Sequence, residues 1–300
     1  MTRNLRALLC VLAAALPAAA RGQDPQEEIR SALEAAQKAQ VAGPSEVKLL
    51  DQAVLKLPAG HVYFPAAEAG RLLQAMGNRT GDDLLGVIFP DRFNWFIVMR
   101  QVKSGYVKDD DARDWNADDL LQSLKKGTEA SNQDRRTRHI PEIEVLGWVE
   151  PPAYDAGTHR LVWSAQSREV GEPDGAERGV NYNTYALGRD GYISMNLVTG
   201  MNSIEAQKPV ARRMLAALEY NAGKRYADFD SSTDRVAEFG LLALIGGVAA
   251  KKLGLFALVA AFAAKFAKVI GVAALGLAVV AAKLLRRRPQ AKADPSLRSG

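Results

Sequence analysis

Cysteine is almost absent from this chain: Cys10 is the only one among 300 residues. It lies within Ala7–Leu16, an apolar run too short to cross a bilayer, because a spanning helix needs roughly 20 apolar residues. Arg3 and Arg6 precede the run, and small residues follow it. This pattern predicts a secretory signal peptide over residues 1–20, either cleaved at its last residue or retained as an anchor. Cleavage would leave no cysteine, which excludes disulfide bonds and thiol catalysis.

Histidine is scarce, and the three histidines lack the spacing of metal ligands. None is paired at a four-residue interval, and no HExxH pattern occurs. An acidic run lacks the central glycine and the late glutamate that a calcium loop needs. We therefore expect no metal site and no cofactor. The residues concerned are His61, His139, His159, Asp109, Asp110, Asp111, Asp114, Asp118 and Asp119.

Recognisable catalytic motifs are missing as well. No serine lies in a GxSxG elbow, and no phosphate loop or dinucleotide fingerprint occurs. Asp155 and His159 come nearest to a catalytic pair, because a carboxylate can orient an imidazole ring. The alternative is a turn over Tyr154–Thr158 in which Asp155 binds its own backbone. We expect no catalytic, cofactor-binding or metal-binding residues, and this favours a protein that is not an enzyme.

Positive charge is missing from the middle of the chain, although the formal net charge of the whole is +5. Residues 21–235 contain 27 Lys and Arg against 32 Asp and Glu, whereas residues 236–300 contain 10 basic and 2 acidic residues. Nucleic-acid binding needs a basic face on the folded domain, so we expect no nucleic-acid partner. Basic residues beside apolar ones fit contact with anionic membrane lipid instead.

The apolar C-terminal tract lacks an uninterrupted run of about 18 residues, because four lysines between positions 251 and 268 divide it. Lysines in the middle of a span are costly, so one span is favoured over two. We predict an interfacial or membrane-associated helix over 236–265, a transmembrane helix over 266–285 and a short basic cytoplasmic tail over 286–300. Arg286–Arg288 on the cytoplasmic side would place residues 21–235 in the periplasm, anchored to a bacterial inner membrane.

Hydrophobic periodicity and turn residues predict an α+β domain over residues 21–235, an antiparallel sheet with flanking helices. The first two strands should form a hairpin through Pro58–Gly60, and the last two through Gly188–Gly191. The predicted helices are Gln26–Gln40, Pro65–Met76, Ala117–Lys126 capped by Asn116, and Ser203–Tyr220 capped by Asn202. The predicted strands are Gln52–Leu57, His61–Phe64, Leu85–Phe89, Trp95–Val102, Glu142–Pro151, His159–Gln166, Asn181–Leu187 and Tyr192–Val198.

The predicted strand Asn181–Leu187 contains two asparagines. Asn181 and Asn183 are two residues apart, so alternation places them on the same face of the strand. They either face solvent or bind a polar ligand. The four tryptophans are expected to pack in the core, with stacking on a ligand as the alternative for one of them; they are Trp95, Trp115, Trp148 and Trp163.

Several short stretches together resemble a bacterial family of membrane-anchored proteins with a domain of unknown function, number 2167. The resemblance spans roughly residues 45–285 and implies the location and the architecture, but no activity and no site residues. The matching stretches are Leu57–Gly60, Gly105–Val107, Trp115–Ala117, Gly147–Trp148, Pro152–Asp155, Thr158–Trp163, Asn181–Thr184 and Leu187–Ser194.

The leading functional hypothesis is therefore a non-enzymatic, membrane-anchored periplasmic module that binds or assembles components of the cell envelope. Membrane lipid would contact its C-terminal helices, and an envelope or membrane protein would be its partner. One alternative is a periplasmic hydrolase of an envelope component that uses Asp155, His159 and one of the acidic residues. Another alternative is an accessory subunit of a membrane transport or stress-response complex.

Overall fold

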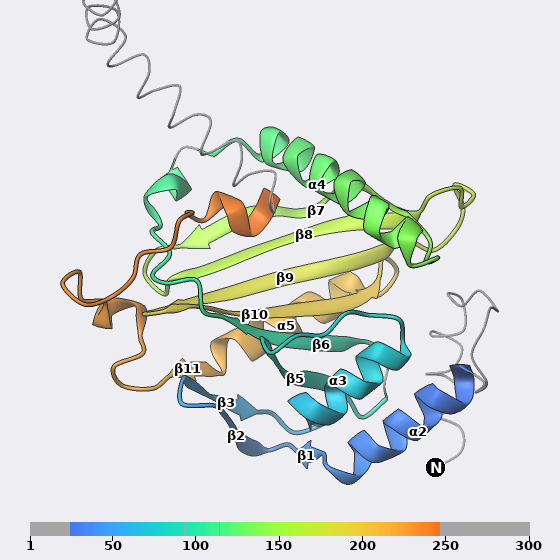
Figure 1. The fold of residues 1–300 in the computed structure, drawn as a ribbon, viewed down its shortest axis with the longest axis horizontal. Helices are drawn as coiled ribbons and strands as arrows, with labels where there is room; N and C mark the ends of the chain where they lie inside the picture. Colours follow the sequence, from blue (N-terminus) through green and yellow to red (C-terminus); the bar gives the residue numbers. More distant parts are fainter. Residues whose placement is uncertain (1–24, 93, 114, 247–300) are drawn as a thin grey trace, which may run out of the picture. The chain divides into compact units, whose positions relative to one another are not determined.

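The computed structural model describes residues 25–246, apart from residues 93 and 114 (Figure 1). The predicted signal peptide 1–20, transmembrane helix 266–285 and tail 286–300 lie outside the described residues. Of the predicted membrane-associated helix, only residues 236–246 are described. No helix among the described residues is long and apolar enough to cross a membrane.

The domain contains a large antiparallel sheet with the strand order β1-β4-β5-β6-β10-β9-β8-β7. This confirms the α+β class with an antiparallel sheet and flanking helices. Its strands are β1 (Val41–Ala42), β4 (His61–Pro65), β5 (Leu84–Pro90), β6 (Phe96–Val102), β7 (Ile143–Asp155), β8 (Arg160–Glu169), β9 (Gly179–Gly188) and β10 (Gly191–Gly200). The edge strand β7 has three register shifts against β8 and carries Pro151 and Pro152, where the sequence predicted the strand to end.

A second, smaller sheet has the order β11-β3-β2, with β2 at Ser45–Leu49, β3 at Ala53–Leu57 and β11 at Leu218–Tyr220. The predicted hairpin between the first two strands is wrong. Pro58 and Gly60, the latter at a φ of 78°, carry the chain from β3 in the small sheet to β4 in the large one. The strand β3 pairs instead with β2 and β11.

Four α-helices pack on these sheets: α2 (Pro25–Lys38), α3 (Ala66–Ala75), α4 (Ala117–Thr137) and α5 (Ile204–Ala216). Asn116 caps α4 as predicted, since its Oδ1 accepts from the backbone N–H groups of Asp118 and Asp119 at 2.8 and 3.2 Å. The prediction for α5 was wrong at both ends. Ser203 occupies the N-cap without a side-chain hydrogen bond, and the last predicted turn forms β11 because it pairs with β3.

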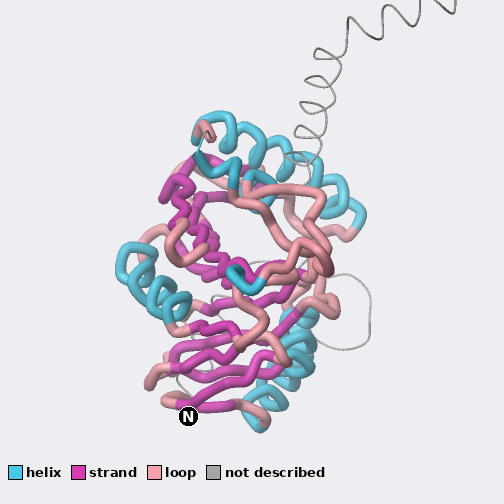
Figure 2. The backbone as a smooth tube through the Cα atoms, turned by 90° about the vertical axis from the view of Figure 1, so that its left-hand side faces the viewer, coloured by secondary structure: helices cyan, strands magenta, loops and turns pink. Residues whose placement is uncertain are grey.

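Alternation divides the side chains of the large sheet between its two faces, and helices lie on both sides (Figure 2). One face forms a continuous core with the small sheet and α5. The opposite face forms two separate cores. One lies under α2 and α3, against β4 and β5, and the other lies under α4 and the 237–245 segment, against β8 and β9.

Residues 236–246 pack on the large sheet within this last core. Leu241, Leu244 and Ile245 are buried there. The carboxylate of Asp111 accepts from the N–H groups of Leu241 and Leu242 at 3.1 and 3.2 Å, and burial raises the pKa of that carboxyl. The apolar side chains at the start of the C-terminal tract are therefore buried against other residues of the domain.

Candidate functional site

A hollow of about 460 Å³ lies on the large sheet between its two separate cores. Its floor comes from three neighbouring strands, β6, β10 and β9, and its walls come from α3 with the loop after it and from α4 (Figure 1). Its volume falls within the range of small-molecule sites. We call it the polar groove, and it is lined by Leu73, Asn78, Arg79, Phe96, Val98, Arg100, Arg135, Asn181, Asn183, Tyr185, Ser194, Asn196 and Val198.

Three asparagines form the polar part of the floor. The register pairs Asn196 of β10 directly with Asn183 of β9, and Asn181 lies two residues before Asn183 on the same strand. The Asn196 Nδ2 donates to Asn181 Oδ1 at 3.0 Å. The Oδ1 of Asn196 is buried and has no hydrogen-bond partner among residues 25–246. An unsatisfied buried acceptor is destabilising by about 1–3 kcal/mol.

The two walls are fastened to each other at one end. Arg79, in the loop after α3, pairs with Asp134 of α4 at 2.6 Å. Arg138, the C-cap residue of α4, donates to the carbonyl oxygen of Gly77 at 2.5 Å. Gly77 follows the end of α3 and has a φ of 79°. These contacts set the separation between α3 and α4 at this end of the groove.

One buried side chain attaches α4 to β7. Asn132 is fully buried, and its amide donates to the carbonyl oxygen of Ile143 at 2.9 Å while accepting from the N–H of Ile143 at 3.1 Å. The helix side chain thus pairs with the first residue of β7 as a neighbouring strand would. Arg135 follows one turn later and reaches the groove from this anchored helix.

The groove carries positive charge and no lining carboxylate. Arg100 pairs with Asp83 at 2.9 Å, and Arg79 pairs with Asp134. Arg135 differs, because no carboxylate of the described chain lies within ion-pair distance of it, and only its Nε is bonded, to the carbonyl oxygen of Pro141 at 2.5 Å. Burial lowers the pKa of this guanidinium, an effect that Glu169 opposes. A partly desolvated guanidinium that has no ion-paired carboxylate among the described residues is a favourable site for an anion.

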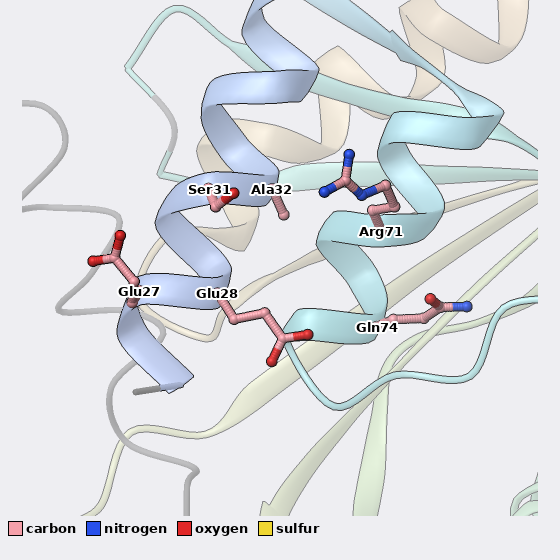
Figure 3. A pocket seen from close by; sticks show the side chains of 6 residues that line it. All are labelled: Glu27, Glu28, Ser31, Ala32, Arg71 and Gln74. Atoms are coloured by element: carbon pink, nitrogen blue, oxygen red, sulfur yellow. The ribbon is translucent and has the colours of Figure 1, made fainter. Parts of the chain in front are cut away.

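A second hollow, between α2 and α3, is a weaker candidate (Figure 3). It is lined by Glu27, Glu28, Ser31, Ala32, Arg71 and Gln74. Figure 3 shows that these side chains come from two helix surfaces and do not converge on one point. Glu27 is already paired with Arg30. This hollow therefore offers a charged surface rather than an organised site.

Asp155 and His159 do not form the pair that the hydrolase hypothesis requires. Asp155 Oδ1 accepts from the N–H of Gly157 at 2.9 Å, and its Oδ2 accepts from the hydroxyl of Thr158 at 2.7 Å. These bonds lower the pKa of Asp155, the Thr158 bond most. The turn interpretation is thus the one that the structure shows.

His159 is held by a different set of side chains. Its Nδ1 lies 3.2 Å from the hydroxyl of Tyr154, which donates to Asp109 at 2.7 Å, and its ring stacks on Tyr226 at 4.1 Å. Burial and the bond to Asp109 raise the pKa of Tyr154. These contacts join the β7–β8 turn to the loops around it. In the part of the chain that is described, no three His, Cys, Asp or Glu residues are grouped as metal ligands would be.

The tryptophans pack as structural residues. Trp95 and Trp163 are buried, and Trp148 meets Trp163 edge to face at 5.9 Å. Trp148 also donates to the carbonyl oxygen of Ala117 at 3.0 Å, which fastens β7 to the start of α4. Neither these three nor Trp115 lines the polar groove.

The sequence identified two residues of the groove floor. Asn181 and Asn183 share a face as predicted, and the structure places that face toward the groove. Ser194 and Asn196 were missed, although they alternate with buried Ile193, Met195 and Leu197 in the same manner. Nothing in the local sequence marks Arg135 as a groove residue, because its place in the groove depends on how α4 packs on the sheet.

Comparison with known proteins gives one family and distant structural likenesses. The family model described as Protein of unknown function (DUF2167) matches residues 41–276. No protein with a curated description matches the sequence. Among solved structures, cyanobacterial PsbP (CyanoP) from Synechocystis sp. PCC 6803 has a TM-score of 0.36 and 10% identity, with 61% of this chain and 91% of that chain covered. The Saccharomyces cerevisiae Ran-binding protein Mog1p has a TM-score of 0.32 and 14% identity, with 62% and 98% covered. Likenesses this distant carry no functional argument.

Proposed function

The chain belongs to the DUF2167 family of proteins of unknown function, and we propose that it is a non-enzymatic binding module whose polar groove holds a polar ligand. The observation that carries this proposal is the convergence of three side-chain amides, Ser194 and three arginines on one hollow of the sheet. Solvent-facing sheet surfaces need no such arrangement. Convergent polar groups in a hollow of this size are typical of ligand sites.

The groove is built for binding rather than for reaction. Its lining contains no carboxylate, histidine, cysteine or lysine that could act as a base or nucleophile. Its amides donate and accept hydrogen bonds and its arginines donate them, and neither exchanges protons near neutral pH. The rigid interior strands beneath them hold their positions, which favours selective recognition.

We also propose that the module is anchored to a bacterial inner membrane with this domain in the periplasm. Support comes from the cationic and apolar pattern of residues 1–20 and from the lysine-divided apolar tract that ends in Arg286–Arg288. An envelope component would then be the ligand or partner of the groove, and membrane lipid would contact the C-terminal tract.

Photo-crosslinking in living cells tests the binding function. A photoreactive phenylalanine analogue replaces Asn183 in the groove of the full-length protein, and Lys48, exposed on the small sheet, carries it in the control. We expect a discrete adduct from position 183 that Ser194→Phe, which fills the groove, suppresses. Equal adducts from both positions, or an adduct unaffected by Ser194→Phe in a protein that melts normally, would contradict the proposal.

A further inference from the structure

We infer that the ligand of the polar groove is an acidic saccharide, whose carboxylate is bound by Arg135 and whose hydroxyls are bound by the asparagine floor. This inference rests on the proposed binding function and specifies its ligand class. Three features of the groove carry it: an arginine with no ion-paired carboxylate among the described residues, the mixed donors and acceptors of the floor, and apolar side chains beside that floor.

The first feature is the positive charge of Arg135. The other two groove arginines already have carboxylate partners, Asp83 and Asp134, whereas Arg135 has none among the described residues. Its Nε is occupied by the carbonyl of Pro141, which leaves the terminal nitrogens to bind a ligand. A guanidinium presents two parallel donors that match the two oxygens of a carboxylate. A neutral ligand would form no ion pair with Arg135.

The second feature is the set of side-chain amides on the groove floor. Each asparagine side chain offers both donors and an acceptor, and Ser194 adds a hydroxyl with the same dual capacity. Sugar hydroxyls are donors and acceptors at once, so a polyhydroxylated ring satisfies such a floor, whereas a simple inorganic anion only accepts and would leave the acceptors of the floor unpartnered.

The third feature is apolar: Phe96 and Val98 on β6 and Leu73 on α3 line the groove beside the asparagines. The ring of Phe96 packs against that of Phe89, with the ring centroids 5.5 Å apart. The C–H face of a sugar ring is apolar, and it can pack against these side chains while its hydroxyls reach the neighbouring asparagines. The groove thus offers polar and apolar contacts side by side, and a pyranose can use both.

The sheet itself argues against an extended peptide as the occupant. The strands β6, β10 and β9 are interior strands, each paired on both sides. Their main-chain donors and acceptors are therefore used, and a peptide cannot join them by strand addition. Recognition in the groove depends on side chains alone, which suits a compact ligand.

Isothermal titration of the full-length protein in mild detergent tests this inference with four probes: D-glucuronate, D-glucose, acetate and the peptide Ala-Glu-Ala. We expect glucuronate to bind about tenfold or more tightly than glucose, because hydrogen bonds to charged groups contribute more than neutral ones. Acetate, which lacks hydroxyls, and the peptide should bind more weakly than glucuronate.

Charge variants assign the effect to the groove. Arg135→Gln should remove most of the advantage of glucuronate over glucose, and Arg135→Lys should restore part of it. Asn183→Asp, which places a negative charge on the floor, should weaken glucuronate more than glucose. Arg71→Gln makes the same charge change in the hollow between α2 and α3 and should have no effect.

The outcomes separate this inference from the proposed function. Equal affinity for glucose and glucuronate would overturn the anionic ligand while the binding module stands. Acetate or the peptide binding as well as glucuronate would overturn the saccharide. No binding of any probe, with a specific adduct at position 183, would overturn the inference alone. Loss of the adduct as well would overturn both.

Discussion

The hydroxyl of Tyr185 donates a hydrogen bond of 3.0 Å to the carbonyl oxygen of Leu244. Tyr185 also lines the polar groove, so one side chain contacts both the groove and the last described segment of the chain. Burial raises the pKa of its phenol, which keeps the hydroxyl protonated and able to donate. The groove is therefore connected to the start of the apolar C-terminal tract through a single residue.

Tyr185→Phe should weaken this connection. Loss of this hydrogen bond should lower the free energy of unfolding by about 1 kcal/mol. Hydrogen exchange of residues 241–246 should accelerate more than that of β9. Tyr192→Phe is the matched control, since the Tyr192 hydroxyl has no hydrogen-bond partner in the described part of the chain. Equal effects of the two variants would show that the Tyr185 hydrogen bond does not stabilise this segment.

Asn132→Leu should destabilise the domain strongly and disturb the groove. The variant leaves the N–H and the carbonyl of Ile143 unpaired against a buried apolar side chain, a change of about 2–5 kcal/mol in the free energy of unfolding. Denaturant titration measures the loss, and ligand affinity at Arg135 should fall in parallel because α4 loses its anchor. Asn221→Leu, at an asparagine in an exposed turn, should change stability far less.

The stability of the β9–β10 turn should depend on pH through Asp234. Its carboxylate accepts from Arg189 Nε at 2.7 Å and from Arg189 Nη2 at 2.9 Å, and these bonds lower the pKa of Asp234 from 3.8 to about 2. Because the folded-state pKa lies below the unfolded one, the stabilisation is present above pH 3.8 and is lost as pH falls toward about 2.

Asp234→Asn tests this dependence by denaturant titration at neutral pH and at about pH 2. The variant should be less stable than the natural protein at neutral pH, and the difference should shrink at the lower pH. Asp82→Asn, at an exposed carboxylate with no ion pair among residues 25–246, should show little difference at either pH. A constant difference for Asp234→Asn would contradict the assignment.

Gly191→Ala should be more destabilising than Gly171→Ala. Both glycines have positive φ, 127° and 92°, so both substitutions strain the backbone by about 1–2 kcal/mol. A Cβ on Gly191 would lie 1.9 Å from the carbonyl oxygen of Val102, whereas nothing lies within 4 Å of one on Gly171. The extra overlap should add about 1–3 kcal/mol, measurable by thermal or chemical unfolding. Equal losses would mean that Val102 gives way freely.

Elements with strong local signals could be predicted from the sequence. The apolar spacing of Ile29, Leu33 and Ala36 predicted α2, and Asn116 marked the start of α4. The glycine-bounded turn at 188–191 predicted the β9–β10 hairpin. In each case the residues that determine the element lie within it or next to it.

Elements that depend on distant pairing could not be predicted in this way. Leu218 pairs with Leu55, so β11 exists only because the small sheet accepts it, and its sequence continues the helical pattern of α5. The same limit applies to the groove. Alternation placed Asn181 and Asn183 on one face, but Arg135 joins them only through the pairing of Asn132 with Ile143.

The two edges of the large sheet differ from its interior in a way that affects how the protein behaves when it is concentrated. At one edge, β7 has three register shifts and two consecutive prolines, which remove N–H donors that another strand would need. At the other edge, β1 is only two residues long. Neither edge offers a template for cross-β pairing, so many copies can be crowded together without the sheet growing from one molecule into the next.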